Sequence, residues 1–186
     1  PLKEYKLGDF YGFHVKWNPQ GDRLMFVLRW LPHDRRFPLL KRFQKKPQLK
    51  LNLATLKPDG SDIHLAIPDA EWSKGGHHPN WCPDGETILM NLNLHGDGLR
   101  FVRVKYDGSE CEAMTQKVLG SGHPTLHQNG DRILTDAYPH EPVAFGDGTT
   151  PLRWVDFDRG EEQTLLRIQT SPSFRGPKGQ LRVDPH

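Results

Sequence analysis

Three stretches of the chain share one pattern of apolar and polar positions. They are GFHVKWNPQGDRLMF (12–26), GHHPNWCPDGETILM (76–90) and SGHPTLHQNGDRILT (121–135). In each stretch an apolar run is followed by a turn sequence that ends in glycine, and then by a second apolar run. A glycine at this place accepts the positive φ that a tight turn requires. Each stretch therefore predicts a β-hairpin.

A second hairpin is predicted after each of the first ones. The segments LNLATLKPDGSDIHLAI, LRFVRVKYDGSECEAMT and LRWVDFDRGEEQTLLRI alternate with period two around an Asp-Gly or Asp-Arg-Gly turn. Two hairpins make a four-stranded unit, and repeated four-stranded units are typical of β-propeller blades. We therefore predict an all-β fold, a β-propeller of about three four-stranded blades that belong to a larger ring. The blades are expected at about 8–68, 69–117 and 118–170, with the start of the next at 171–186.

The spacing of one histidine per unit agrees with this fold. The separations are 64 (14 to 78), 45 (78 to 123) and 63 (123 to 186) residues, so a period near 45 is interrupted by insertions. A blade has about 40 to 45 residues. Because propellers usually have about 4 to 8 blades, three leave open sheet edges. We expect the rest of a longer chain or another copy to complete the ring.

The composition narrows the class of protein. Only 35% of residues are hydrophobic, and no apolar stretch approaches the roughly 18 residues of a membrane helix. The net charge of +2 does not indicate a nucleic-acid binder. The sequence does not open on an apolar leader segment, so we expect a cytoplasmic location, with a periplasmic one as the alternative. Cys82 and Cys111 lack metal-type spacing and are expected to be buried free thiols.

Two sets of histidines are expected on one rim of the propeller. The first set marks the start of the first strand of each unit: His14, His78, His123 and His186. The second set follows the second strands: His33, His95 and His140. Converging imidazoles suit Zn, Mn, Ni or Fe, and Asp184 could complete a mixed site. The alternative is that each inner histidine caps a strand or bridges two blades.

Long connections are expected at the same rim, where propeller loops carry function. The connection from His33 to Lys46 carries six Arg or Lys against one Asp, which favours an anionic ligand. A solvated basic run is the alternative. Contacts to an anionic substrate are predicted from the following residues: Arg35, Arg36, Lys41, His14 and His140.

The motifs resemble a known group of propellers. The combination of H-x-x-W-x-P-D-G with a following L-x-x-V-x-x-D-G unit resembles TolB-like repeats. The forms GHHPNWCPDGETILMN, GHPTLHQNGDRILTDAYPHE and LRVDPH resemble, more particularly, the oligogalacturonate lyase family of propeller polysaccharide lyases. The resemblance implies β-elimination on short acidic uronides, with a divalent metal, typically manganese, held by histidines and a glutamine. By motif it places the base at His78 and metal ligands at His123 and His186.

The resemblance has one departure and leaves two other functions open. No counterpart of the glutamine ligand is found, and Asp184 occupies its neighbourhood. The chemistry itself requires a charge that neutralises the uronate carboxylate, because the C5 proton is otherwise feebly acidic. One alternative is a non-catalytic TolB-like propeller that serves as a binding or scaffold module. Another is a propeller that gates a peptidase, although the chain carries no G-x-S-x-G nucleophile motif.

Overall fold

Three four-stranded antiparallel sheets make up the protein. The computed structural model describes residues 5–33 and 48–169. The first sheet contains β1 (Gly8–Trp17), β2 (Leu24–Pro32), β3 (Lys50–Leu56) and β4 (His64–Ile67). The second contains β5 (Gly76–Trp81), β6 (Thr87–Leu92), β7 (Arg100–Lys105) and β8 (Glu112–Ala113). The third contains β9 (Thr125–Leu126), β10 (Arg132–Thr135), β11 (Thr149–Asp156) and β12 (Glu161–Gln169).

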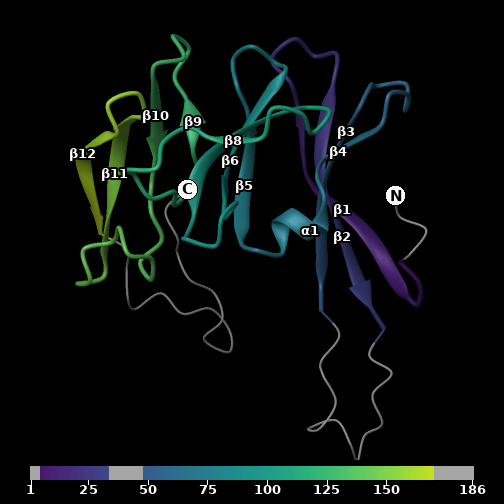
Figure 1. Cartoon of the computed structure of the whole chain (residues 1–186), viewed down its shortest axis with the longest axis horizontal. Helices are drawn as coiled ribbons and strands as arrows, with labels where there is room; N and C mark the ends of the chain where they lie inside the picture. Colours follow the sequence, from purple (N-terminus) through teal and green to yellow (C-terminus); the bar gives the residue numbers. More distant parts are fainter. Residues whose placement is uncertain (1–4, 34–47, 170–186) are drawn as a thin grey trace, which may run out of the picture.

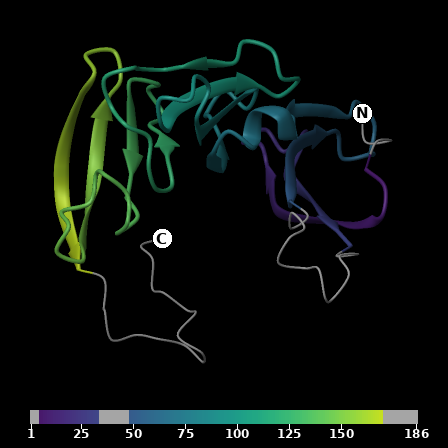
Figure 2. The same ribbon diagram turned by 60° about the horizontal axis from the view of Figure 1, so that its bottom comes forward.

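The sheets are arranged as blades around part of a ring. They stand side by side in chain order, and a single-turn helix, α1 (Asp69–Trp72), lies between the first and the second (Figure 1). Figure 2 shows that they follow an arc that does not close. This confirms the predicted all-β fold of about three four-stranded blades of a larger ring. The strands fall inside the three predicted blade ranges, whose limits stay predictions, and the expected start of a fourth blade at 171–186 lies outside the described residues.

The first hairpin of each blade closes at the glycine that the sequence predicts. Gly21, Gly85 and Gly130 have φ angles of 71°, 71° and 74°. An L side chain in this left-handed region costs about 1–2 kcal/mol. The three turns therefore depend on glycine, and they set the register of the strands that lead to the site.

The middle blade is packed on both faces. Because side chains alternate along a strand, Met90 of β6 packs toward the first blade and Leu89 packs toward the third. Asn91 lies on the same side as Leu89, and its Nδ2 donates a 2.8 Å hydrogen bond to the carbonyl oxygen of Gly122. The inter-blade core thus also positions the segment that precedes β9.

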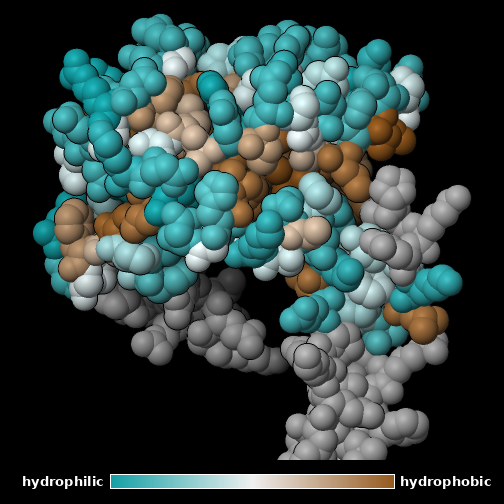
Figure 3. All heavy atoms as spheres, viewed as in Figure 1, coloured by the Kyte–Doolittle hydropathy of each residue, from teal (hydrophilic) through white to brown (hydrophobic). Residues whose placement is uncertain are grey.

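Large apolar side chains are exposed on β1 of the first blade and on β12 of the third, within the part of the chain that the structure describes. Phe10 and Tyr11 on β1 are each 42% exposed, and Leu165 and Leu166 on β12 are 50% and 57% exposed. Figure 3 shows a band of apolar surface between hydrophilic regions on one side of the molecule. The two open ends of the arc stay the predicted places at which further blades continue the ring.

One of the two cysteine predictions is wrong. Both thiols are free, but only Cys82 is buried, and burial raises its pKa to about 12. Cys111 is exposed because it lies directly before β8, the short strand at the edge of its sheet.

No helix within residues 5–33 and 48–169 has the length and apolar character needed to cross a membrane.

Candidate functional site

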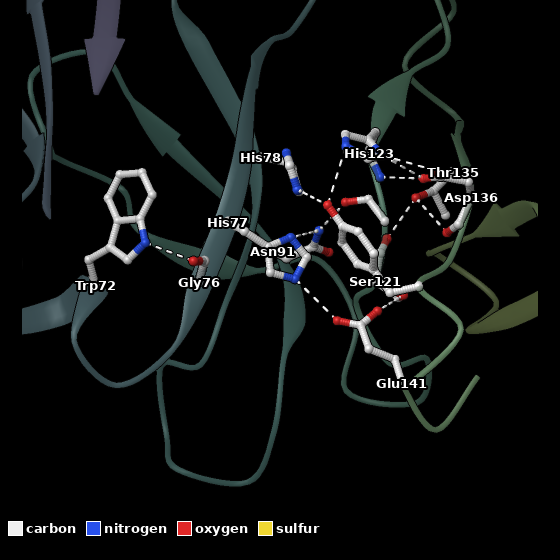
Figure 4. Close-up of polar contacts among 12 residues, drawn as sticks. Trp72, Gly76, His77, His78, Asn91, Ser121, His123, Thr135, Asp136 and Glu141 are labelled. Carbon is white, nitrogen blue, oxygen red and sulfur yellow. Dashed lines mark hydrogen bonds and ion pairs between the residues drawn. The ribbon is translucent and has the colours of Figure 1, made fainter. Parts of the chain in front are cut away.

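Three of the predicted histidines, one from each blade, lie next to one another. The ring centroids of His14 and His78 are 6.3 Å apart, and those of His78 and His123 are 3.9 Å apart. We call these three residues the histidine row; Figure 4 shows two of them, His78 and His123, close together on neighbouring blades. The row lines a groove of about 530 Å³ whose wall also includes Lys16 and Asn80. The fold therefore gathers side chains that lie far apart in the sequence.

Two members of the row sit at irregular points of their strands. The pairing of β1 with β2 shifts register between Phe13 and Lys16, and that of β5 with β6 shifts between His77 and Asn80. His14 and His78, inside these two irregularities, have φ angles of 53° and 56°. Positive φ is uncommon for residues with side chains, and bulges re-aim the side chains that they carry. We conclude that the backbone departs from regular strand geometry where it places these imidazoles.

The prediction that His14 marks the start of its strand is therefore wrong. β1 begins at Gly8, six residues earlier (14 − 8 = 6). His33 lies at that distant end, where its backbone N–H donates to Leu7 and its Nε2 lies 3.0 Å from the Asp9 carboxylate. At about 3.3 Å per strand residue, Asp9 is roughly 16 Å from His14 along β1. In the first blade, the histidines of the two predicted sets, His14 and His33, thus lie far apart.

The other two histidines of the second set differ from each other. His95 is exposed in the connection after β6. His140 follows β10, and its ring centroid lies 5.5 Å from that of Tyr138, which itself contacts the histidine row. Only His140 is thereby brought close to the row through a described contact.

Asp136 fixes the imidazole of His123. Nδ1 of His123 lies 3.0 Å from both carboxylate oxygens of Asp136, and the backbone N–H of His123 donates to one of them at 2.6 Å. Burial raises the pKa of Asp136, but the hydrogen bonds and charge of His123 outweigh burial and hold the pKa below its usual value. An ionised carboxylate accepts the Nδ1 proton, so in the tautomer that carries its proton on Nδ1 the other nitrogen, Nε2, has the lone pair. This is the arrangement in which histidines commonly bind metals.

The hydroxyl of one tyrosine contacts both of the two closest imidazoles. The hydroxyl of Tyr138 lies 2.5 Å from Nε2 of His78 and 3.5 Å from Nε2 of His123. The sequence pattern alone does not single out Tyr138 or Asp136. Both stand in the quoted segment TDAYPHE, but they are separated from His78 by about sixty residues, and Tyr138 bonds to it with a separation of 60. Only the folded chain shows that they belong to the site.

A second polar network holds this segment against the middle blade. Nδ1 of His77 accepts a 3.2 Å hydrogen bond from Asn91, so its Nε2 is the donor to Glu141 at 3.3 Å (Figure 4). The other carboxylate oxygen of Glu141 accepts a hydrogen bond from Ser121. Burial raises the pKa of Glu141, but these hydrogen bonds and the charge of His77 outweigh burial and hold the pKa below its usual value. The network ties the residues around Tyr138 to β5.

Electrostatics keep His78 neutral. Its pKa is lowered to about 3, first because burial disfavours the charged form and then because of the positive charges of His123, His77 and His14, against a smaller opposing effect of Asp136. The pKa of His14 is also lowered, mainly by burial and by the charges of Lys16 and Arg29. At neutral pH the imidazole of His78 is therefore unprotonated.

Acidification is expected to destabilise the fold through His78. An unfolded histidine has a pKa of about 6.5. Between this value and about 3, the unfolded state therefore binds more protons at this residue than the folded state does, so the free energy of unfolding falls as the pH falls. Urea unfolding at pH 7 and pH 5 measures the effect, and a His78→Gln variant should lose less stability between these values than the wild type. Equal losses in the two proteins would assign the pH dependence to other groups.

Several predicted site residues lie outside the described part of the chain. These are the candidate metal ligands His186 and Asp184 and the candidate substrate contacts Arg35, Arg36 and Lys41. Among residues 5–33 and 48–169, no group of three or more His, Cys, Asp or Glu side chains is placed to hold a metal ion. The described residues therefore fit a metal only in part, through the oriented imidazole of His123.

Comparisons with known proteins agree on the fold. The sequence matches no family model. It is 26% identical over 109 residues to an uncharacterized protein of Agrobacterium fabrum, covering 58% of this chain and 36% of that protein. The structure is similar to TolB from Acinetobacter baumannii, with a TM-score of 0.52 and 12% identity over 85% of this chain and 32% of that one. It is also similar to an oligogalacturonate lyase in complex with manganese, with a TM-score of 0.54 and 15% identity over 86% of this chain and 42% of that one.

The extent of these matches agrees with the open arc of three sheets. The chain spans about a third of the length of the curated relative, 36%. It likewise spans less than half of the two solved structures, 32% and 42%. Sequence identities of 12% and 15% establish the fold and not the activity. The chain thus has the fold of a partial TolB-like β-propeller, the fold that it shares with oligogalacturonate lyases.

Proposed function

We propose that this chain is part of a propeller lyase that binds acidic oligosaccharides along the histidine row and cleaves them by metal-assisted β-elimination. The observation that carries the proposal is the pair formed by His78, which is neutral, and His123, which Asp136 orients. The likeness to an oligogalacturonate lyase solved with manganese supports it. In this scheme His78 is the catalytic base, and His14 and His140 contact the substrate.

The reaction requires a base next to C5 of a uronate unit. His78 takes the C5 proton, the C5–H electron pair becomes the C4–C5 double bond, and the C4–O bond breaks. The departing sugar oxygen then takes up a proton from solvent. A base acts best when its pKa approaches the working pH. The lowered pKa of His78 keeps its imidazole unprotonated at neutral pH, which is the form that can take up the C5 proton.

The described residues contribute one ligand to the proposed metal. Asp136 holds the Nδ1 proton of His123, which leaves Nε2 as the donor atom. His186 and Asp184 stay the predicted further ligands. A divalent cation, manganese by likeness to the solved lyase, would neutralise the uronate carboxylate and so increase the acidity at C5.

Cleavage should give an unsaturated product. Incubating the complete protein with oligogalacturonate and Mn²⁺ is expected to produce absorbance from the new C4–C5 double bond or from the keto product that follows. The same protein in EDTA should give no signal, because the carboxylate would no longer be neutralised. Absence of product with every uronide tested, together with absence of metal in the purified protein, would reject the lyase function.

The second candidate is a propeller that binds an acidic glycan without cleaving it. It is favoured by the likeness of the structure to TolB from Acinetobacter baumannii. One experiment distinguishes the two functions. Binding of oligogalacturonate in a calorimeter, with no double bond formed over hours in Mn²⁺, would establish the non-catalytic one.

A further inference from the structure

A second row of side chains runs beside the histidine row. Lys16, Asn80 and Thr125 each stand two residues after a member of the histidine row, in the segments HVK, HPN and HPT. Nζ of Lys16 donates to Oδ1 of Asn80 at 3.3 Å, and Nδ2 of Asn80 donates to Oγ1 of Thr125 at 3.3 Å. We call these three residues the lysine row. It crosses all three blades, and every member lines the groove that contains the histidine row.

The charge of Lys16 is not neutralised within the described chain. Its two hydrogen-bond acceptors are neutral, namely the carbonyl oxygen of Pro79 at 3.0 Å and the amide oxygen of Asn80. No carboxylate forms an ion pair with Lys16 among residues 5–33 and 48–169. Lys16 is partly buried, and this burial lowers the pKa of its ammonium group. A partly dehydrated cation with only neutral partners gains most from an anionic ligand.

The polarity of the row also favours an anion. An ammonium group has three N–H donors and no acceptor, and the two acceptors of Lys16 leave one donor for a ligand. The hydroxyl of Thr125 accepts from Asn80 and keeps its own proton to donate. Both ends of the row can therefore donate hydrogen bonds into the groove.

We propose that the lysine row is a second anion-binding subsite, which holds the carboxylate of the uronate unit next to the one that is cleaved. Members of the two rows are two residues apart in the sequence, and all of them line the same groove. One ligand can thus contact both rows if it has acidic groups on neighbouring units. A groove of about 530 Å³ lies within the range of about 300–1,000 Å³ that is usual for ligands larger than a single small group. The choice of a uronide as ligand rests on the proposed function, and the assignment of the neighbouring carboxylate to Lys16, Asn80 and Thr125 is new.

Calorimetry with one-unit and two-unit ligands tests the subsite. Galacturonate and digalacturonate are titrated into the complete protein in EDTA, so that metal-assisted cleavage does not occur. Lys16→Met is expected to weaken digalacturonate binding about tenfold or more and to remove most of the advantage of digalacturonate over galacturonate. Lys16→Arg should retain most of the affinity because it keeps the charge. Lys57→Met is the matched control, since Lys57 is an exposed lysine in the turn between β3 and β4.

Thr125→Val keeps the test decisive if Lys16→Met does not fold. Thr125 is exposed, and loss of its hydroxyl should weaken digalacturonate binding about threefold. The subsite is rejected if the wild type does not bind digalacturonate, or if both variants bind it as tightly as the wild type. If digalacturonate binding depends on Lys16 but Mn²⁺ produces no cleavage, the subsite is supported and the lyase function is rejected.

Discussion

His78→Gln is expected to reduce turnover of oligogalacturonate by about a thousandfold. General-base catalysis contributes roughly 10²–10⁴ to enzymatic rates, and His78 is the neutral imidazole of the histidine row. Glutamine keeps a polar group near the Tyr138 hydroxyl, which lies 2.5 Å from Nε2 of His78 in the wild type. Initial rates from the absorbance of the unsaturated product measure the effect. The affinity for digalacturonate should change only a few-fold, because the lysine row is unaltered.

A second histidine provides the control for this variant. His127 is exposed, and its ring packs on Trp154, away from the histidine row. His127→Gln removes an imidazole in the same way but should leave the rate unchanged within about twofold. If His78→Gln retained the wild-type rate and only lowered the melting temperature, His78 would be a packing residue, as in the structural alternative.

Gly122→Ala is expected to destabilise the fold by about 2–5 kcal/mol. Gly122 has a φ of 66°, which costs an alanine about 1–2 kcal/mol. An added Cβ would also lie 2.2 Å from the backbone oxygen of Asp136. Relieving such an overlap costs typically about 1–3 kcal/mol. Because Gly122 precedes His123, the shift should also disturb the bond between His123 and Asp136. Urea unfolding measures the stability, and the product assay measures the second effect.

Gly130→Ala separates the two causes. Gly130 has a similar φ of 74°, but an added Cβ would meet no atom within 4 Å. Its cost should therefore be that of the backbone conformation alone, about 1–2 kcal/mol, with no loss of turnover. Equal destabilisation by the two alanines would show that the close contact with Asp136 relaxes freely, and would weaken the case that this segment is rigidly positioned.

The bulges in β1 and β5 explain how a simple repeat acquires a site. In a regular strand, successive side chains point to opposite faces of the sheet, and His14 and His78 would follow this alternation. Both residues instead have positive φ at a shift in strand register. Strained conformations of this kind cluster at functional sites. The middle blade then adds Asn91, which links His77 to the carbonyl of Gly122 and so joins the second blade to the third.

The sequence by itself determined the architecture of this protein and the identity of the histidine row. Hairpins, turn glycines and blade number follow from local rules, because the alternation of apolar residues and the need for positive φ act within a few residues. His14, His78 and His123 could be selected for the same reason, since equivalent positions of a repeat return to equivalent places in the fold.

Only the tertiary structure decided what surrounds that row. The bulge that carries His14, the distance that separates it from His33, and the contacts of Asp136 and Tyr138 depend on packing between blades. The lysine row could not be predicted from the sequence either, because a Lys, an Asn and a Thr do not form a recognisable motif. They become a site only when three blades place them in one groove. A repeat specifies where its own side chains recur, whereas hydrogen bonds between residues about sixty positions apart arise only when the blades pack together.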